Sequence, residues 1–172
     1  MDVVDKFLSG YSSDIRCQVE KLVVTNKLGE YLKTRYSESH GVSSDADLRE
    51  YLLAIKNKHL KKSPPISKVI FDGRIHVIKN ALGTHSYVNR VQGNKIKSKN
   101  EIRISAVFKQ APADFLKMIV VHELAHVKEK EHNKSFYRLC QHMLPDYHQL
   151  EFDFRLYLIA QSMMRKDVVS ST

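Results

Sequence analysis

Three histidines within eleven residues have the spacing of metal ligands. His122, Glu123 and His126 form a His-Glu-x-x-His pattern, and His132 follows six residues later. Residues four apart on a helix are separated by about 40° around its axis, so the imidazoles of His122 and His126 project side by side. Imidazole nitrogens bind zinc well, and a catalytic zinc site takes three protein ligands and keeps one position open. The pattern therefore predicts one Zn²⁺ ion.

Glu123 is the expected general base beside that ion. It lies one step round the helix from His122, where its carboxylate can reach water in the open position. Bound zinc lowers the pKa of such water toward neutrality, and Glu123 would take its proton and pass it to a leaving amine. The sequence thus predicts a zinc metallopeptidase that hydrolyses peptide bonds with a zinc-bound water activated by Glu123. Unpaired imidazoles in a buried apolar helix would be costly, which argues against a chance pattern.

His132 is the expected third ligand, provided that the helix ends after His126. On a continuous helix, His132 would lie about 240° round from His126 and would face away from the metal. Asn133 is a suitable N-cap for a new helix, so a turn before it can return His132 to the zinc. The spacing equals that of the metzincin pattern, which has a glycine where this chain has Glu129. Glu151, on a downstream helix, is the alternative third ligand.

The other polar side chains have weaker claims on this chemistry. Polarising a substrate carbonyl is a minor possibility for five downstream residues: Tyr137, His142, Tyr147, His148 and Arg155. The only two cysteines, Cys17 and Cys140, lie far apart in the chain. They indicate neither a disulfide framework nor a cysteine-based zinc site, and they favour a reducing compartment.

The histidines are expected on a core helix that follows a strand. Residues 113–129 are apolar on nearly every side, and Pro112 suits the first turn of that helix. Residues 101–108 alternate with the two-residue period of a half-buried strand, preceded by a turn at Gly93 and Asn94. Asp72 and Gly73 favour a tight hairpin between two β-branched runs. Further helices are expected after Asn133 and after Pro145.

The first sixty residues are expected to be helical. Apolar residues from Asp14 to about Tyr36 recur at helical spacing, and Ser44 suits the start of a second amphipathic helix. The basic, proline-containing segment 61–66 ends helical character. We therefore predict a boundary there, with an N-terminal helical subdomain (residues 1–62) and a catalytic domain (residues 63–172).

Composition indicates a folded chain with an excess of positive charge. Its 172 residues are 42% hydrophobic, which suits a domain with a real core, and the net charge is +9. Such a charge favours acidic partners such as nucleic acid. Two groups of lysines are candidates for that surface: Lys58, Lys61 and Lys62, and, if their segment is extended, Lys95, Lys97 and Lys99. The N-terminus does not resemble a signal peptide and no apolar run could span a bilayer, so we expect a cytoplasmic protein without membrane association.

The motifs around the histidines resemble the YgjP-like metallopeptidase family, which is related to the SprT-like and Wss-type zinc proteases. His122–His126 is followed by KEKEHNK (residues 128–134), by Phe-Tyr (136–137) and by LPDY (144–147), and the likeness extends from about Lys68 to Leu158. The NRVQG segment (89–93) is similar to the family's Arg-x-x-Gly segment, with a valine in place of the usual tryptophan.

The resemblance implies a compact zincin-like α+β fold, in which a small antiparallel or mixed sheet packs on a buried active-site helix. It also implies one zinc ion held by His122, His126 and the histidine at the position of His132, with Glu123 as the base. The substrate would be a polypeptide, for which the strand at residues 101–108 is the expected pairing edge. Two other hypotheses stay open: a zinc protein associated with nucleic acid or protein–DNA complexes, and a non-proteolytic protein with structural zinc.

Overall fold

The computed structural model describes residues 3–75, 83–92 and 95–170, with side chains described for residues 3–75 and 100–165. The chain forms two compact units. One comprises residues 1–38 and 148–172, and the other comprises residues 39–147. The second unit contains the sheet and the three histidines, and its helices and strands confirm the predicted α+β class.

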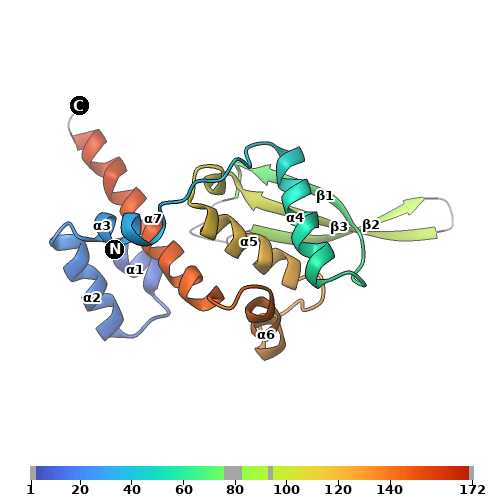
Figure 1. The fold of residues 1–172 in the computed structure, drawn as a ribbon, viewed down its shortest axis with the longest axis horizontal. Coiled ribbons are helices and arrows are strands. Elements are labelled where there is room, and N and C mark those ends of the chain that lie inside the picture. The colour runs from blue at the N-terminus through green and yellow to red at the C-terminus, as the bar shows by residue number, and fades with distance from the viewer. Residues whose placement is uncertain (1–2, 76–82, 93–94, 171–172) are drawn as a thin grey trace. The chain divides into compact units, whose positions relative to one another are not determined.

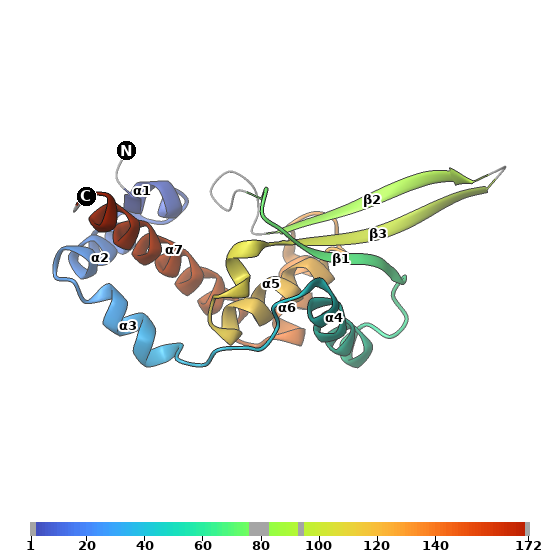
Figure 2. The ribbon, with the colours of Figure 1, turned by 90° about the horizontal axis from the view of Figure 1, so that it is seen from above.

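A three-stranded sheet forms one layer of the second unit. Its strands are β1 (Ile66–Asp72), β2 (Gly83–Gln92) and β3 (Lys95–Ser105), in the order β1-β3-β2. Strand β1 runs parallel to β3, with Val69 opposite Ile102, whereas β2 runs antiparallel to β3, with Val91 opposite Ile96. The hairpin of β2 and β3 extends well beyond β1 (Figure 2).

The helices of this unit cover the sheet. They are α4 (Asp45–His59), the 3-10 helix η1 (Ala106–Lys109), α5 (Ala113–Ala125) and α6 (Lys134–Met143). Helix α4 packs along β1, and α5 packs against β2 and β3 (Figure 1). Helix α5 is buried on every side from Met118 to Ala125, as its continuous apolar sequence predicts. The centre of the unit is therefore the helix that carries the His-Glu-x-x-His pattern.

Local sequence signals set several of the element boundaries. Ser44 and Asp47 form a capping box at the start of α4, in which each side chain accepts a hydrogen bond from the other residue's backbone N–H. This confirms the predicted helix start. In contrast, the single helix predicted between residues 14 and 36 is two helices, α2 (Ser13–Val24) and α3 (Leu28–Arg35). Asn26, between them, has a φ of 56°, a left-handed conformation that no helix can continue through.

One prediction about the strands needs correction, and another lies largely outside the described residues. The strand predicted to run to residue 108 ends at Ser105, because the Ser105 side chain caps η1 by accepting a hydrogen bond from the Val107 N–H. The hairpin predicted at Asp72 and Gly73 stays a prediction, and the partner of β1 within the described residues is the parallel strand β3. Most of the second predicted hairpin strand, residues 76–79, lies outside the described residues, as do Gly93 and Asn94, which connect the antiparallel strands β2 and β3.

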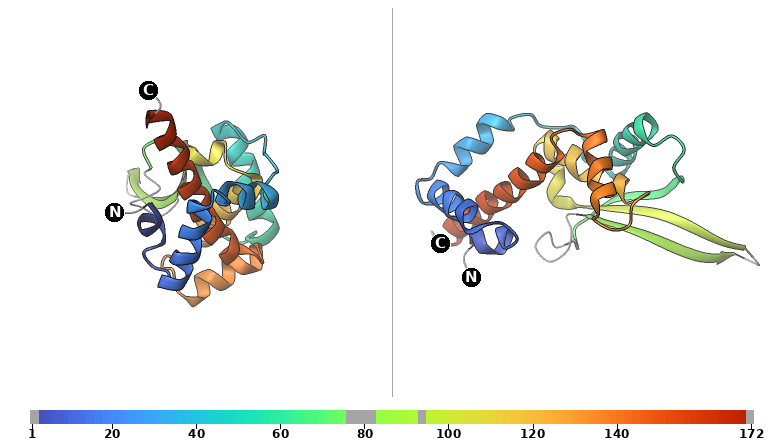
Figure 3. Two further views of the ribbon diagram at one scale, coloured as in Figure 1. Left: turned by 90° about the vertical axis from the view of Figure 1, so that its left-hand side faces the viewer. Right: turned by 90° about the horizontal axis from the view of Figure 1, so that it is seen from below.

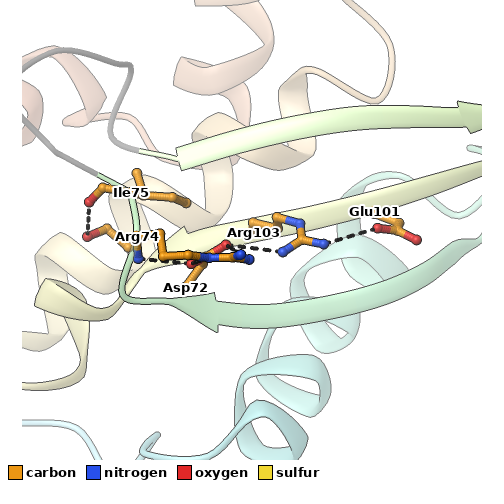
Figure 4. A network of polar contacts seen from close by, with 6 residues as sticks. Asp72, Arg74, Ile75, Glu101 and Arg103 are labelled. Carbon is orange, nitrogen blue, oxygen red and sulfur yellow. Dashed lines mark hydrogen bonds and ion pairs between the residues drawn. The ribbon is translucent and has the colours of Figure 1, made fainter.

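A polar network joins β1 to β3 on one face of the sheet (Figure 4). The Asp72 carboxylate accepts hydrogen bonds from Arg74 and from Arg103 Nη1, the latter at 3.1 Å. Arg103 also lies 3.7 Å from the Glu101 carboxylate. The charges therefore alternate along the two strands and stabilise their parallel pairing at the end of β1.

The first unit consists of helices around one long helix. Helices α1 (Val3–Leu8), α2 and α3 lie beside α7 (Tyr147–Ser170) (Figure 3). Asp153 of α7 is fully buried and accepts hydrogen bonds from the hydroxyls of Tyr31 and Tyr36. Arg155 of the same helix donates to the Phe7 carbonyl. These polar contacts fix α1 and α3 against α7.

The two units divide the chain differently from the predicted boundary at residue 62. Helix α4 belongs with the sheet because its apolar face, which includes the fully buried Leu48 and Leu52, packs against β1. The last 25 residues belong with the N-terminal helices instead. Within the described residues, no helix has the length and apolarity needed to cross a membrane.

Candidate metal centre

Helix α5 ends at the second histidine of the pattern. His126 is its C-cap, and the next three residues turn back on the helix: Val127 N–H donates to the Leu124 carbonyl, and Lys128 and Glu129 N–H donate to the Ala125 carbonyl. The prediction that the helix ends between His126 and His132 is confirmed, although it ends earlier than the predicted residue 129. Asn133 then caps α6 by accepting a hydrogen bond from Phe136 N–H at 2.9 Å, also as predicted.

This turn brings the three imidazoles together. The distance between Nε2 atoms is 3.0 Å for His126 and His132, and 3.2 Å for His132 and His122. One ligand atom from each ring lies within 4.8 Å of the others. A tetrahedral zinc ion with bonds of about 2.0 to 2.1 Å separates its ligand atoms by about 3.3 to 3.4 Å. The three rings therefore fit one zinc ion with small adjustments.

Hydrogen bonds hold the outer nitrogens of two of these rings. His122 Nδ1 lies 2.6 Å from the Tyr147 hydroxyl, and His126 Nδ1 lies 3.0 Å from the Glu129 carbonyl oxygen. Such outer contacts orient metal-binding imidazoles and set which nitrogen faces the ion. Glu129, which stands where the metzincin pattern has a glycine, therefore contacts the histidine cluster through its backbone carbonyl.

An apolar ring lies against all three imidazoles. Phe136 is fully buried, and its ring centroid is 5.0 Å, 4.5 Å and 4.8 Å from those of His122, His126 and His132. The cap at Asn133 fixes the start of α6 and hence the position of Phe136. Exposure rises from the buried His122 to the exposed His132, so the cluster opens to solvent on the His132 side.

Glu123, the residue after His122 on α5, is fully buried. Neither carboxylate oxygen has a hydrogen-bond partner in the described part of the chain, and burial raises the pKa of Glu123 to about 8. Burial, followed by the neighbouring His126 and His132, lowers the pKa of His122 to about 3, and burial also lowers the pKa of His126. Those two imidazoles are therefore neutral, which is the form that binds a metal. At neutral pH this pKa keeps Glu123 mostly in the neutral acid form in the metal-free protein. A buried carboxyl group without hydrogen-bond partners is costly, so it fits a functional role better than a structural one.

The remaining candidates divide between the two units. Glu151, the alternative ligand, lies in the first unit, where it accepts a hydrogen bond from Arg155 at 3.3 Å. His148 also belongs to the first unit. In the second unit, the His142 ring contacts His59, with 5.8 Å between ring centroids, and the Tyr137 ring stacks against His132 at 6.4 Å. Among the described residues, the group of side chains arranged for a metal consists of the three histidines alone.

Two features of the centre were missed by sequence reasoning. Tyr147 was considered only as a group that polarises substrate, whereas its hydroxyl contacts His122. The Glu129 carbonyl is a backbone atom, for which the sequence contains no signal beyond the shortness of the turn. Both contacts depend on how chain segments meet in space.

Comparison with known proteins identifies the family. The family model described as YgjP-like, metallopeptidase domain matches residues 93–155, which contain the three histidines and Glu123. A protein named UTP pyrophosphatase from Escherichia coli (strain K12) is 54% identical over 157 residues, which cover 91% of this chain and 94% of that protein. No solved structure matches. Because the relative aligns along nearly all of both chains and the family model covers the histidine cluster, the chain belongs to the YgjP-like family.

Proposed function

We propose that the chain is a zinc-dependent hydrolase in which His122, His126 and His132 hold one ion and Glu123 is the general base. The observation that carries this proposal is the convergence of three Nε2 atoms, two of them from the helix that also carries the buried, unpartnered carboxyl group of Glu123. A closed structural site normally uses four protein ligands, whereas three ligands leave a position open for reaction. Zinc is the proposed metal because three histidine ligands with one open position form a common catalytic zinc site.

The side chains of the centre have separate tasks in this proposal. A bound zinc ion polarises the oxygen atoms brought to it and makes water easier to deprotonate. Glu123 takes a proton from the attacking water on a carboxylate oxygen and passes it to the leaving group. The buried Phe136 ring lies against the three imidazoles and excludes solvent from the surfaces that it contacts. Peptide and phosphoanhydride bonds can both be hydrolysed by such an arrangement.

For the substrate, we propose UTP, which water would convert to UMP and pyrophosphate. The water oxygen forms a bond to the α-phosphorus, and the bond from that phosphorus to the oxygen that bridges the α and β positions breaks. Glu123 takes the water proton and passes it to the departing pyrophosphate. This choice is supported by the name of the relative, UTP pyrophosphatase, which aligns with 91% of the chain. The net charge of +9 also favours a substrate with several negative charges.

Peptide hydrolysis is the second candidate, supported by the His-Glu-x-x-His pattern and by the description of the matching family model. The strand expected to pair with a peptide is β3, however, and β3 is the central strand of the sheet. Its backbone is paired on both sides, with β1 at Ile102 and with β2 at the same residue. That placement of a peptide is therefore wrong.

A comparison of substrates with a single variant tests these proposals. Purified protein loaded with zinc is incubated with UTP and with an unfolded polypeptide, and the release of pyrophosphate and of peptide fragments is measured. Glu123→Gln should retain zinc and lose at least about 100-fold in the rate of UTP hydrolysis, since general base catalysis contributes about 10²–10⁴-fold. Release of peptide fragments without release of pyrophosphate would contradict UTP hydrolysis and support peptide hydrolysis. Zinc binding with neither product in wild type would favour the structural-zinc hypothesis.

Association with nucleic acid stays a prediction. Strand β3 begins at Lys95, so the segment with Lys95, Lys97 and Lys99 is extended, as that prediction required. Binding that weakens steeply as salt is added would support it, and no binding at low salt would contradict it. The cytoplasmic location also stays a prediction.

A further inference from the structure

Tyr147 places a hydroxyl group against the most buried of the three histidines. The distance from Tyr147 Oη to His122 Nδ1 is 2.6 Å, and both side chains are buried. Tyr147 is the first residue of α7, and its N–H donates to the Leu144 carbonyl at 3.0 Å. The turn that follows α6 therefore determines where this ring lies.

The tautomers of the imidazoles follow from their hydrogen-bond partners. The Glu129 carbonyl can only accept a hydrogen bond, so His126 Nδ1, which lies 3.0 Å from it, carries the hydrogen. In a neutral ring the other nitrogen is then a bare acceptor, which makes His126 Nε2 the acceptor in its 3.0 Å contact with His132 Nε2. His132 Nε2 is accordingly the donor.

The same reasoning extends to His122. His132 Nε2 also lies 3.2 Å from His122 Nε2, and two N–H groups facing each other at that distance would repel. His122 Nε2 is therefore bare and its Nδ1 carries the hydrogen. The hydroxyl oxygen of Tyr147 is the acceptor for that hydrogen. Two of the three rings thus turn a lone pair toward the centre of the cluster before any metal binds.

We propose that Tyr147 is a positioning residue of the metal centre, whose hydroxyl oxygen holds the Nδ1–H of His122 and so directs Nε2 of that ring at the ion. The proposal rests on the zinc site proposed above. The Glu129 carbonyl does the same for His126. His132 is the ring that must change its tautomer when zinc binds, and it is the exposed one, so water can carry the proton. A phenol in this place adds no formal charge to the centre, unlike the carboxylates that often hold metal-binding histidines.

Nitrogen NMR of the metal-free, full-length protein tests the tautomers directly. Histidines labelled with ¹⁵N report which ring nitrogen carries the hydrogen, and single substitutions assign the signals. We expect the Nδ1–H form for His122 and His126 and the Nε2–H form for His132 in wild type. The Nε2–H form of His122 in wild type would overturn the proposal, and this measurement needs no variant of Tyr147.

Zinc affinity provides the second test. Tyr147→Phe keeps the ring and removes the hydroxyl, whereas Tyr51→Phe removes a hydroxyl from a partly buried tyrosine on α4 of the same unit. Competition with a chromophoric chelator should show about 10–100-fold weaker zinc binding for Tyr147→Phe, the usual cost of losing an outer contact of a ligand. Tyr51→Phe should match wild type. The absorption spectrum of bound Co²⁺ should change in Tyr147→Phe only.

The outcomes separate this proposal from the proposed function. If Tyr147→Phe binds zinc and Co²⁺ as wild type does, Tyr147 is not a positioning residue, whatever the protein hydrolyses. If wild type binds neither metal, the proposed hydrolase fails, and the tautomer of His122 still decides whether the Tyr147 hydroxyl accepts its hydrogen bond.

Discussion

Asn133 connects the stability of α6 to the position of a metal ligand. Its side chain accepts a hydrogen bond from Phe136 N–H at 2.9 Å, and the preceding residue is His132. Asn133→Ala removes this cap, which costs about 1 kcal/mol of folding stability. For a protein of this size, that loss lowers the Tm by about 2–4 °C. If the whole cost falls on the conformation that places His132, zinc binding weakens by about fivefold, because 1.4 kcal/mol corresponds to a factor of ten.

A second cap in the same unit supplies the control. Ser44 begins α4, and its side chain accepts a hydrogen bond from Asp47 N–H at 3.1 Å. Ser44→Ala should cost a similar amount of stability, and it should leave zinc affinity unchanged because α4 carries none of the three histidines. Thermal unfolding of the zinc-free proteins gives the first quantity, and chelator competition gives the second. Equal effects of the two variants on zinc affinity would refute the local coupling between the α6 cap and His132.

Three further predictions concern charge and metal. Arg74, followed by Arg103, holds the pKa of Asp72 well below its usual range. The ionised carboxylate therefore stabilises the fold above about pH 4, and this contribution is lost as the pH falls further. The difference in unfolding free energy between wild type and Asp72→Asn, measured by urea unfolding, should shrink in acid. Asp153→Ala leaves two tyrosine hydroxyls without their charged acceptor and should cost about 2–4 kcal/mol in urea unfolding. A chelator should lower the Tm of zinc-loaded wild type by about 5–10 °C, because zinc at 100 times its Kd contributes about 2.7 kcal/mol to the folded state. In His132→Ala the chelator should lower the Tm much less.

The metal cluster was largely predictable because its spacing is local. Two histidines four residues apart must share a helix face, and the angle of His132 on a continued helix required an end after His126. Asn133 supplied the start of the next helix, and the structure has that cap. Tyr147 lies 25 residues from His122, and no periodicity in the sequence links the two.

Strand pairing could not be predicted, since it depends on contacts between distant segments. The Asp72–Gly73 pair has the composition of a hairpin turn, yet β1 pairs with a strand about 30 residues further on. Part of the reason lies in the Asp72 side chain, which accepts a hydrogen bond from Arg103 of β3 and so stabilises the parallel pair. The parallel pair depends on such contacts across the sheet, which no local sequence signal specifies.

The proline-containing segment after α4 shows why the predicted boundary differs from the observed units. Helix α4 ends at His59, before the predicted segment and its prolines, and the segment is a hydrogen-bonded turn and not a linker. Lys56 Nζ donates to the Ser63 carbonyl at 3.3 Å, and Ser63 Oγ donates to the Leu60 carbonyl at 2.7 Å. Leu60 is itself buried. A helix stop in the sequence therefore marks the end of an element and does not by itself mark the end of a folded unit.

The choice between a nucleotide and a peptide follows from what surrounds the metal ligands. Three imidazoles and a buried carboxylate serve water attack on phosphorus as well as on a carbonyl carbon. The peptide hypothesis placed its substrate along residues 101–108, and the pairing of β3 on both sides rules out that placement without ruling out peptide hydrolysis. A nucleoside triphosphate needs no strand edge, and its charge suits a chain with 28 basic and 19 acidic residues. The charge therefore supports the proposed nucleotide substrate, and the release of pyrophosphate or of peptide fragments decides between the two substrates.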